Sequence, residues 1–262
     1  MTATTIPVTE RRLPAFGGFS LGMIALELRR LLRNKRTVVF SVIMPPAFFL
    51  LFGSSGDYQT ERVGDGNVTA YVLISMAVYG AMLATTSGGA MVSIERAAGW
   101  SRQLRLTPLK PAAYVAIKLT LAMIIGAVSV LAVNVVGIFF GADMPVGTWI
   151  ACAVLAWVCA LVFAAFGLFM GYLLPSENVM QILGPGLAIL SFAGGLFVPL
   201  DTLGHTFATV AKFTPVYGVG ELARYPLTHD GDVWVAILNV VVWTALFALG
   251  AMWRFRRDTA RV

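Results

Sequence analysis

Long apolar segments alternate with short polar ones along most of the chain. Six of these segments are close to the length of a membrane span, at about residues 37–53, 70–92, 117–141, 149–174, 179–200 and 233–253. A helix needs roughly 20 mostly apolar residues to cross about 30 Å of hydrocarbon. The pattern therefore predicts an all-α integral membrane protein with six transmembrane helices across residues 37–253, and with residues 1–36 and 254–262 outside the bilayer.

Two of the six segments contain residues that oppose a continuous helix. The first holds Pro45 and Pro46, and the fifth holds Gly184-Pro185-Gly186. Proline lacks the backbone N–H that a helix interior needs, and its ring crowds the preceding turn. We therefore expect a break in the first helix and an interruption in the fifth. No small-residue cleavage site follows the first segment, so we expect an uncleaved anchor rather than a signal peptide.

The composition excludes an ordinary soluble domain. Only 12% of the residues are charged and 58% are hydrophobic, whereas a soluble domain is typically about 25% charged. The net charge of +6 would favour nucleic-acid binding in a soluble protein. Lipid is the solvent that tolerates so few charges, so the placement of the basic residues matters more than their sum.

Basic residues gather on one side of the predicted membrane. Of the 19 lysines and arginines, 16 fall in the N-terminal tail, in the loop between the second and third segments with its flanks, or in the C-terminal tail. Only Arg62, Lys212 and Arg224 remain for the other side. Because Lys and Arg mark cytoplasmic loops, both termini and the second loop are predicted to be cytoplasmic. An even number of spans agrees, and nucleic acid is not an expected partner.

Residues 19–34 show the periodicity of an amphipathic helix. One stripe contains Leu21, Ile24, Ala25, Leu28, Leu31 and Leu32, and the other side contains Glu27, Arg29, Arg30 and Arg33. Such a helix lies in the membrane interface with its arginines toward lipid phosphates. We therefore expect an N-terminal interfacial helix, with a plain charged segment as the alternative.

The second loop, residues 93–116, is longer and more patterned than a simple connection requires. A charged stretch runs from Glu95 to Arg105, and Thr107-Pro108 and Pro111 then signal a turn. This pattern predicts a short cytoplasmic helix on which a soluble partner could push. A solvated loop that only sets the orientation is the alternative.

The stretch from Asp201 to Asp232 is too apolar for a free external loop. Backbone at membrane depth must be helical or packed on protein. We therefore expect one or two short external helices before the last span.

Patterns that carry catalysis or bind metal are missing from the sequence. It contains no Walker A motif, no HExxH, no CxxC and no GxSxG. Cys152 and Cys159 are expected to pack as small apolar residues. His205 and His229 have no clear carboxylate partners in the sequence. We expect no metal site, no cofactor bound by this chain and no catalysis.

Polar residues inside the predicted spans are uncharged. They are Thr85, Thr86, Ser87, Asn134, Gln181 and Ser191, and none of them titrates near neutral pH. Because the polar residues inside the predicted spans carry no charge, a proton-coupled carrier is not expected. The pairs Gly137/Gly141 and Gly167/Gly171 fit close helix contacts. A transport protein of this kind has no visible energy source of its own, so a partner would supply the energy.

The second loop also carries a pattern that resembles a known family. Glu95-Arg96-x-x-Gly99, followed by Leu104-x-Leu106-Thr107-Pro108 and Pro111, resembles the cytoplasmic helix of type-2 ATP-binding-cassette (ABC) export permeases. Two further stretches agree with the same family, namely Pro175-Ser176-Glu177-Asn178, and Gly194 to Leu200 followed by Phe213-Thr214-Pro215-Val216-Tyr217 and Glu221-Leu222-Ala223-Arg224. The resemblance covers nearly the whole chain and is closest to the drug-resistance branch typified by the daunorubicin permeases.

The resemblance implies a permease subunit of an exporter that moves a hydrophobic or amphipathic compound, such as a drug or a lipid, out of the cytoplasm or inner leaflet. Two permease halves, identical or sister subunits, would be driven by two cytoplasmic ATPase subunits that hold ATP and Mg²⁺. The expected location is the bacterial inner (plasma) membrane. Export of a polysaccharide or another cell-envelope precursor, and a secondary carrier without an ATPase, are the alternatives.

Two sets of candidate residues follow from this resemblance. The ATPase is expected to contact Glu95, Arg96, Gly99, Trp100 and Arg102, together with the interfacial helix that bears Glu27, Arg29, Arg30 and Arg33. Aromatic and arginine side chains are frequent anchors of such interfaces. A translocation path between the second and fifth spans would be lined by Val78, Met82, Thr85, Phe192 and Phe197, with ordinary packing as the alternative for the apolar members.

Overall fold

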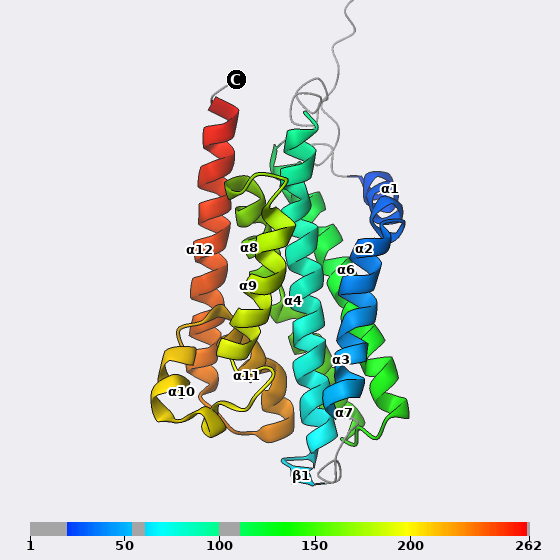
Figure 1. Ribbon diagram of the computed structural model, residues 1–262, viewed down its shortest axis with the longest axis vertical. Coiled ribbons are helices and arrows are strands. Elements are labelled where there is room, and N and C mark those ends of the chain that lie inside the picture. The colour runs from blue at the N-terminus through cyan, green and yellow to red at the C-terminus, as the bar shows by residue number, and fades with distance from the viewer. Residues whose placement is uncertain (1–19, 54–60, 100–110, 261–262) are drawn as a thin grey trace, which may run out of the picture.

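The computed structural model describes residues 20–53, 61–99 and 111–260, which form a bundle of helices (Figure 1). The first part contains α1 (Leu21–Leu32), α2 (Lys35–Val38), the π-helical turn η2 (Val39–Ile43), α3 (Met44–Gly53), the strands β1 (Arg62–Val63) and β2 (Gly66–Asn67), and α4 (Val68–Ala97). The rest contains α6 (Pro111–Phe139), α7 (Val146–Cys159), α8 (Leu161–Leu173), α9 (Val179–Ala193), the 3₁₀ turn η3 (Leu200–Leu203), α10 (His205–Ala211), α11 (Pro215–Thr228) and α12 (Val233–Ala260).

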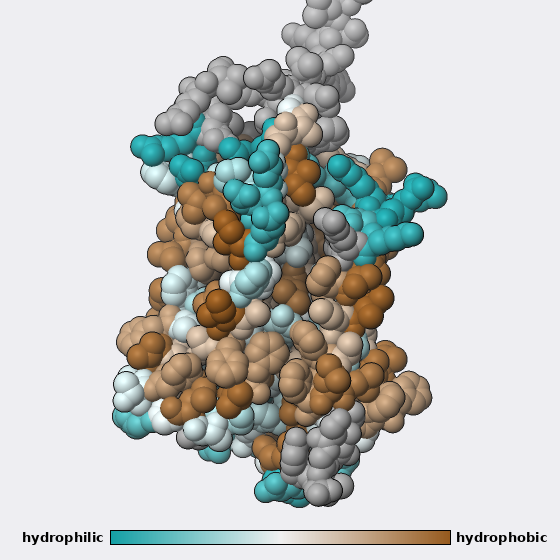
Figure 2. Space-filling model, in the orientation of Figure 1, coloured by the Kyte–Doolittle hydropathy of each residue, from teal (hydrophilic) through white to brown (hydrophobic). Residues whose placement is uncertain are grey.

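Four helical segments in the described part are long and apolar enough to cross a membrane. They are Val68–Ala97, Ala113–Phe139, Val146–Leu173 and Val233–Phe255. Two shorter apolar segments, Val39–Gly53 and Val179–Ala193, coincide with the first and fifth predicted spans. Figure 2 shows a broad apolar band between hydrophilic patches at the two ends of the molecule. The prediction of an all-α, multi-pass membrane protein is therefore confirmed, and the count of six spans stays a prediction.

The helix of the first apolar segment contains a wider π-helical turn just before its two prolines. A π-helical turn over Val39–Ile43 leads directly into α3, whose first turn contains Pro45 and Pro46. Pro46 cannot donate to the carbonyl of Val42, and its ring would crowd that carbonyl in a regular α-helix. The wider π turn accommodates this crowding. The expected break is thus a local widening within a continuous helical segment.

Helix α9 is continuous through Pro185, so the expected interruption at Gly184-Pro185-Gly186 is wrong. Proline removes one hydrogen bond to the carbonyl of Gln181, and membrane helices tolerate that loss. The helix ends at Ala193 instead of reaching residue 200. Gly194 caps the helix and Gly195 follows with φ of +78°, a left-handed conformation that favours glycine.

Glycines bring α8 against the backbone of the central helix α4. A Cβ built at Gly167 would lie 2.1 Å from the carbonyl oxygen of Thr86, and one at Gly171 would lie 3.2 Å from the Cα of Ala90. Only a residue without a side chain fits such an approach. The predicted close contact at Gly167/Gly171 is therefore confirmed.

The second glycine pair divides between two roles. A Cβ at Gly137 would lie 2.3 Å from Leu73 Cδ1, so this glycine is also a contact between helices. Gly141 has φ of +83° and no neighbour that a Cβ would meet within 4 Å. It turns the chain after α6 instead of packing against a helix, so that part of the expectation is wrong.

At the end of the molecule where β1 and β2 pair, two asparagine side chains join neighbouring segments by hydrogen bonds. Asn67 caps α4 by accepting from the backbone N–H of Ala70 at 2.9 Å, and it donates to the carbonyl of Gly141 at 2.8 Å. Asn239 on α12 donates to the carbonyls of Lys212 and Thr214 at 2.7 and 3.0 Å. The Asn67 bonds join the start of α4 to the turn after α6, and the Asn239 bonds join α12 to the α10–α11 segment.

The two ends of the bundle differ in content (Figure 1). The start of α1, the end of α4 and the end of α12 lie at one end, and the β1–β2 hairpin, α10 and α11 lie at the other. The described chain therefore begins and ends at the same end of the bundle. This arrangement is the one that an even number of crossings requires.

Candidate functional site

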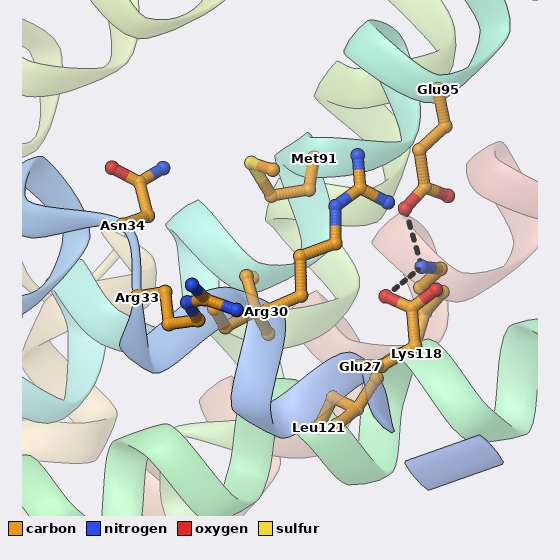
Figure 3. Close-up of a pocket in the computed structure, with 10 residues that line it drawn as sticks. Glu27, Arg30, Arg33, Asn34, Met91, Glu95, Lys118 and Leu121 are labelled. Atoms are coloured by element: carbon orange, nitrogen blue, oxygen red, sulfur yellow. Dashed lines mark hydrogen bonds and ion pairs between the residues drawn. The ribbon is translucent and has the colours of Figure 1, made fainter. Parts of the chain in front are cut away.

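A buried cluster of charges joins three helices at the α1 end of the molecule (Figure 3). Lys118 Nζ on α6 lies 2.5 Å from Glu95 Oε1 on α4 and 3.0 Å from Glu27 Oε2 on α1. The side chains of Lys118 and Glu95 are only 4% and 5% exposed, and that of Glu27 is 12% exposed. One ammonium group thus holds two carboxylates that come from different helices.

Tyr114 completes the partners of Glu95. Its hydroxyl donates to Glu95 Oε2, the carboxylate oxygen that Lys118 does not contact. Tyr114 lies one turn before Lys118 on α6, and its ring faces the ammonium group at 5.3 Å from Lys118 Nζ. Both oxygens of Glu95 therefore have partners on α6.

The ammonium group and the two carboxylates can be buried because they pair with one another. An isolated charge in a water-poor environment carries a large desolvation penalty, and attraction offsets that penalty only when the geometry is good. Among the described residues, Lys118 is the single cation bonded to both carboxylates, so both depend on it. A change at Lys118 therefore affects α1, α4 and α6 together.

An apolar stripe places Glu27 beside Lys118. Ile24 and Leu31 on α1 are 7% and 6% exposed and pack with Ile117 and Leu121 of α6. Glu27 lies between them, three residues after Ile24 and four before Leu31, on neighbouring positions of the helix surface. Burial of the stripe therefore turns the Glu27 carboxylate toward α6.

Arg96 fastens the end of α4 on its other side. Its guanidinium donates to the carbonyls of Gly171 and Tyr172 at 3.2 and 3.0 Å, and it lies over the Tyr172 ring with Cζ 5.5 Å from the centroid. These carbonyls belong to the last turns of α8, where unpaired carbonyls favour a cation. Glu95 and Arg96 thus hold α4 to α6 and α8 respectively.

The predicted ATPase-contacting residues differ in what the structure shows. Glu95 and Arg96 lie in the last turn of α4 and are turned into the protein. Gly99 follows with φ of +74° and no atom within 4 Å of a built Cβ. Trp100 and Arg102 lie outside the described residues. Arg29 and Arg30 on α1, and Arg33 directly after it, are all exposed, and Arg30 and Arg33 also border a cavity beside the charge cluster.

The predicted path residues also separate into groups. Val78 and Met82 are fully buried, and Met82 Sδ lies 4.0 Å from the hydroxyl of Ser191, so α4 and α9 meet there. Phe197 packs edge-on against Tyr79 with ring centroids 5.0 Å apart.

Thr85 and Phe192 lie away from that contact. Thr85 donates to the carbonyl of Ala81 at 2.8 Å, and its methyl group faces Gly126 of α6 instead of α9. Phe192 is 47% exposed on the surface of α9.

Sequence reasoning missed Lys118, Tyr114 and Arg224. Lys118 was counted as an orientation charge, although acidic residues are few on that side and Glu27 and Glu95 were available as partners. Arg224 is 5% exposed, stacks on Tyr71 at 4.8 Å and donates to the carbonyl of Gly195 at 2.9 Å. Arg224 ends the stretch Glu221-Leu222-Ala223-Arg224, which resembles the same permease family. That resemblance could have set it apart from an exposed loop arginine.

Near Arg224, burial and the carboxylates of Glu221 and Asp232 raise the pKa of Tyr217, and the Arg224 charge partly opposes that rise. The Tyr217 phenol is therefore neutral at physiological pH. Among the described residues, no group of three or more His, Cys, Asp or Glu side chains lies close enough together to hold a metal ion.

The described residues thus form a multi-pass helical bundle in which buried charges fix the end of α4. The sequence matches the family model described as ABC-2 type transporter over residues 21–227, and the chain belongs to this family. It is similar to the putative transport permease YvfS of Bacillus subtilis (strain 168), with 27% identity over 240 residues, 89% of this chain and 96% of the relative. The family resemblance is therefore confirmed, and the chain is a membrane transport permease.

Proposed function

We propose that this chain is the membrane-spanning permease subunit of an ATP-driven exporter in the bacterial plasma membrane, with six spans and both termini cytoplasmic. Membership in the ABC-2 family supports the transport role. The sequence has no Walker A motif, so ATP and Mg²⁺ would be held by separate subunits. Two such subunits would bind at the end of the molecule where α1 and the end of α4 lie.

The buried bridge from Glu27 through Lys118 to Glu95 carries this proposal. It lies directly before Gly99 and residues 100–110, which we expect to meet the ATPase. Because α6 and α8 are bonded to the last turn of α4, and α1 is bonded to Lys118 of α6, a push on this segment would move the four helices together. The charge cluster would therefore pass a movement of the end of α4 on to the neighbouring helices.

The structure refines the roles of the predicted contact residues in this proposal. Glu95 and Arg96 face inward, so they act as positioning residues that fix the end of α4. Trp100 and Arg102 remain the proposed direct contacts, together with the exposed side of α1.

The transported molecule would pass where α4 meets α9. In the single chain, Val78 and Met82 are closed against neighbouring side chains, so opening requires α4 and α9 to separate. A second permease half, a copy or a sister subunit, would provide the other wall. The contact offers Met82, Ser191 and aromatic rings but no charge, which favours a hydrophobic or amphipathic compound, such as a drug or a lipid, in multidrug-type efflux.

A pull-down tests the proposal directly. The tagged chain, taken from its native membrane, is expected to retain a soluble subunit with a Walker A motif and ATPase activity. Lys118→Met should uncouple that activity from the transported compound. Arg62→Met should not, because Arg62 lies at the opposite end in an exposed pair with Asp143. A single chain without any ATPase would overturn the proposal.

A further inference from the structure

A cavity of about 250 Å³ lies beside the charge cluster, between α1, α4 and α6 (Figure 3). Its charged lining consists of Arg30, Arg33, Lys118, Glu27 and Glu95. Both carboxylates are bonded to Lys118. Within the part of the chain that the structure describes, Arg30 and Arg33 form no ion pair with a carboxylate. The cavity therefore offers two guanidinium groups that no carboxylate of the described residues neutralises.

The two arginines are positioned to bind one anion. Arg30 lies in the last turn of α1, and Arg33 follows directly after the helix with a helical backbone conformation. At this spacing of three residues, the two side chains emerge at neighbouring positions. Figure 3 shows Arg30 extending from α1 toward the end of α4, with Arg33 beside it at the rim. Guanidinium groups bind phosphate oxygens through paired, charge-assisted hydrogen bonds. With three cations and two carboxylates, the lining carries a net charge of +1.

The surroundings of the cavity indicate a lipid as the source of the phosphate. Met91 and Leu121 contribute apolar wall to the same cavity. On α1, Leu21 and Leu32 are 78% and 49% exposed, as expected of side chains that face acyl chains. An amphipathic helix that buries such residues holds its arginines at the level of the lipid phosphates.

We propose that this cavity binds the phosphate headgroup of an anionic phospholipid through Arg30 and Arg33, with the lipid chains leaving past the apolar side of α1. The bound headgroup adds a second link between α1 and the end of α4, next to the Glu27–Lys118–Glu95 bridge. The site concerns lipid binding by this chain and does not depend on which compound is transported.

Native mass spectrometry of the full-length protein, released from nanodiscs of phosphatidylcholine and phosphatidylglycerol, tests the proposal. The wild type is expected to retain phosphatidylglycerol over phosphatidylcholine. The double variant Arg30→Gln/Arg33→Gln should retain about tenfold less, because charge-assisted hydrogen bonds are lost. Arg29→Gln is the matched control, since Arg29 is on the same helix but does not line the cavity, and its retention should equal the wild type. Equal retention by the double variant overturns the proposal.

Two further measurements test where and what the protein binds. The first distinguishes binding in the cavity from binding to a charged surface, and the second distinguishes a lipid ligand from free phosphate. Met91→Phe keeps every charge but fills the cavity, so it should also lower retention of phosphatidylglycerol. Retention unchanged by Met91→Phe overturns the assignment to the cavity. Displacement of the lipid by millimolar inorganic phosphate would show that free phosphate is the ligand and would overturn the assignment to lipid.

Discussion

Lys118 has a larger role than its position in the sequence indicates. It is bonded to both Glu27 and Glu95, and all three side chains are largely buried. Removing one partner from a buried ion pair leaves an uncompensated charge, which costs far more than the pair itself contributes. The consequences of this geometry can be measured in the free energy of unfolding.

Lys118→Met should lower the free energy of unfolding by about 3–5 kcal/mol, because two carboxylates are left without their cation. Arg62→Met is the matched control. Its pair with Asp143 has side chains 70% and 67% exposed, and exposed pairs contribute about 0–1 kcal/mol. Thermal unfolding of the two variants in the same detergent checks the difference. Equal midpoints would mean that the cluster does not stabilise the protein.

A double-mutant cycle tests whether Lys118 and Glu95 act as a pair. Lys118→Met and Glu95→Gln should each destabilise the protein, and the double variant should be about 1–3 kcal/mol more stable than the sum of the two effects predicts. The same unfolding measurement supplies all four corners of the cycle. Strict additivity would show that the two side chains do not interact in the membrane-embedded protein.

Single residues were also where sequence reasoning was weakest. The count of Lys and Arg assigned Lys118 and Arg224 to sides of the membrane, which is all that such a count contains. Whether a charge is buried depends on which helices meet, and that information is not local. Glu95 was singled out by its pattern, but its carboxylate faces Lys118 and Tyr114 within the protein.

At the scale of helices, periodicity and length were informative. Of the predicted apolar stripe of α1, Ile24 and Leu31 are buried, as a period of 3.6 residues requires of one face. Leu21, Ala25 and Leu32 are exposed, and Glu27, predicted on the polar side, faces Lys118 on the buried side. Proline was a poorer guide, since Pro185 lies inside a continuous helix while Pro45 and Pro46 follow a π turn. Whether a proline breaks a helix depends on neighbouring packing, which the sequence does not give.

The contact between α4 and α8 predicts opposite effects for two glycine substitutions. Gly167→Ala places a Cβ 2.1 Å from the backbone oxygen of Thr86, so the helices must separate, at a cost of about 1–3 kcal/mol for overpacking. Gly147→Ala on α7 meets no atom within 4 Å and should be neutral or stabilising by about 0.5–1 kcal/mol. Unfolding midpoints should therefore shift in opposite directions. A shift of Gly167→Ala in the same direction as Gly147→Ala would contradict the close approach.

At the scale of the whole molecule, the sequence predicted which end of the bundle each segment reaches better than it predicted which segments cross the bilayer. The ends of the described chain share one end of the bundle with the charge cluster, as even crossing requires (Figure 1). The two short apolar segments, Val39–Gly53 and Val179–Ala193, decide whether there are six crossings. Each has 15 residues, about 22 Å of helix, which is shorter than the average hydrocarbon thickness of about 30 Å.

Single cysteines can establish whether these two segments cross. Ser20→Cys, Glu61→Cys, Glu177→Cys and Asp230→Cys would each be introduced after the buried Cys152 and Cys159 are replaced by alanine, since all four positions are exposed. With six crossings, a membrane-impermeant maleimide should label Glu61→Cys and Asp230→Cys in intact cells. Ser20→Cys and Glu177→Cys should react only after the cells are permeabilised.

The four positions form two pairs, one on each side of a short segment. Ser20 and Glu61 flank the segment that ends with α3, and Glu177 and Asp230 flank α9. Labelling of both members of a pair in intact cells, or of neither, would mean that the segment between them returns to the side it came from. Because the segments are short, a crossing would also require the bilayer to thin locally or the flanking residues to extend to the interface. Opposite labelling within both pairs would therefore establish that both segments cross and that the protein has six spans.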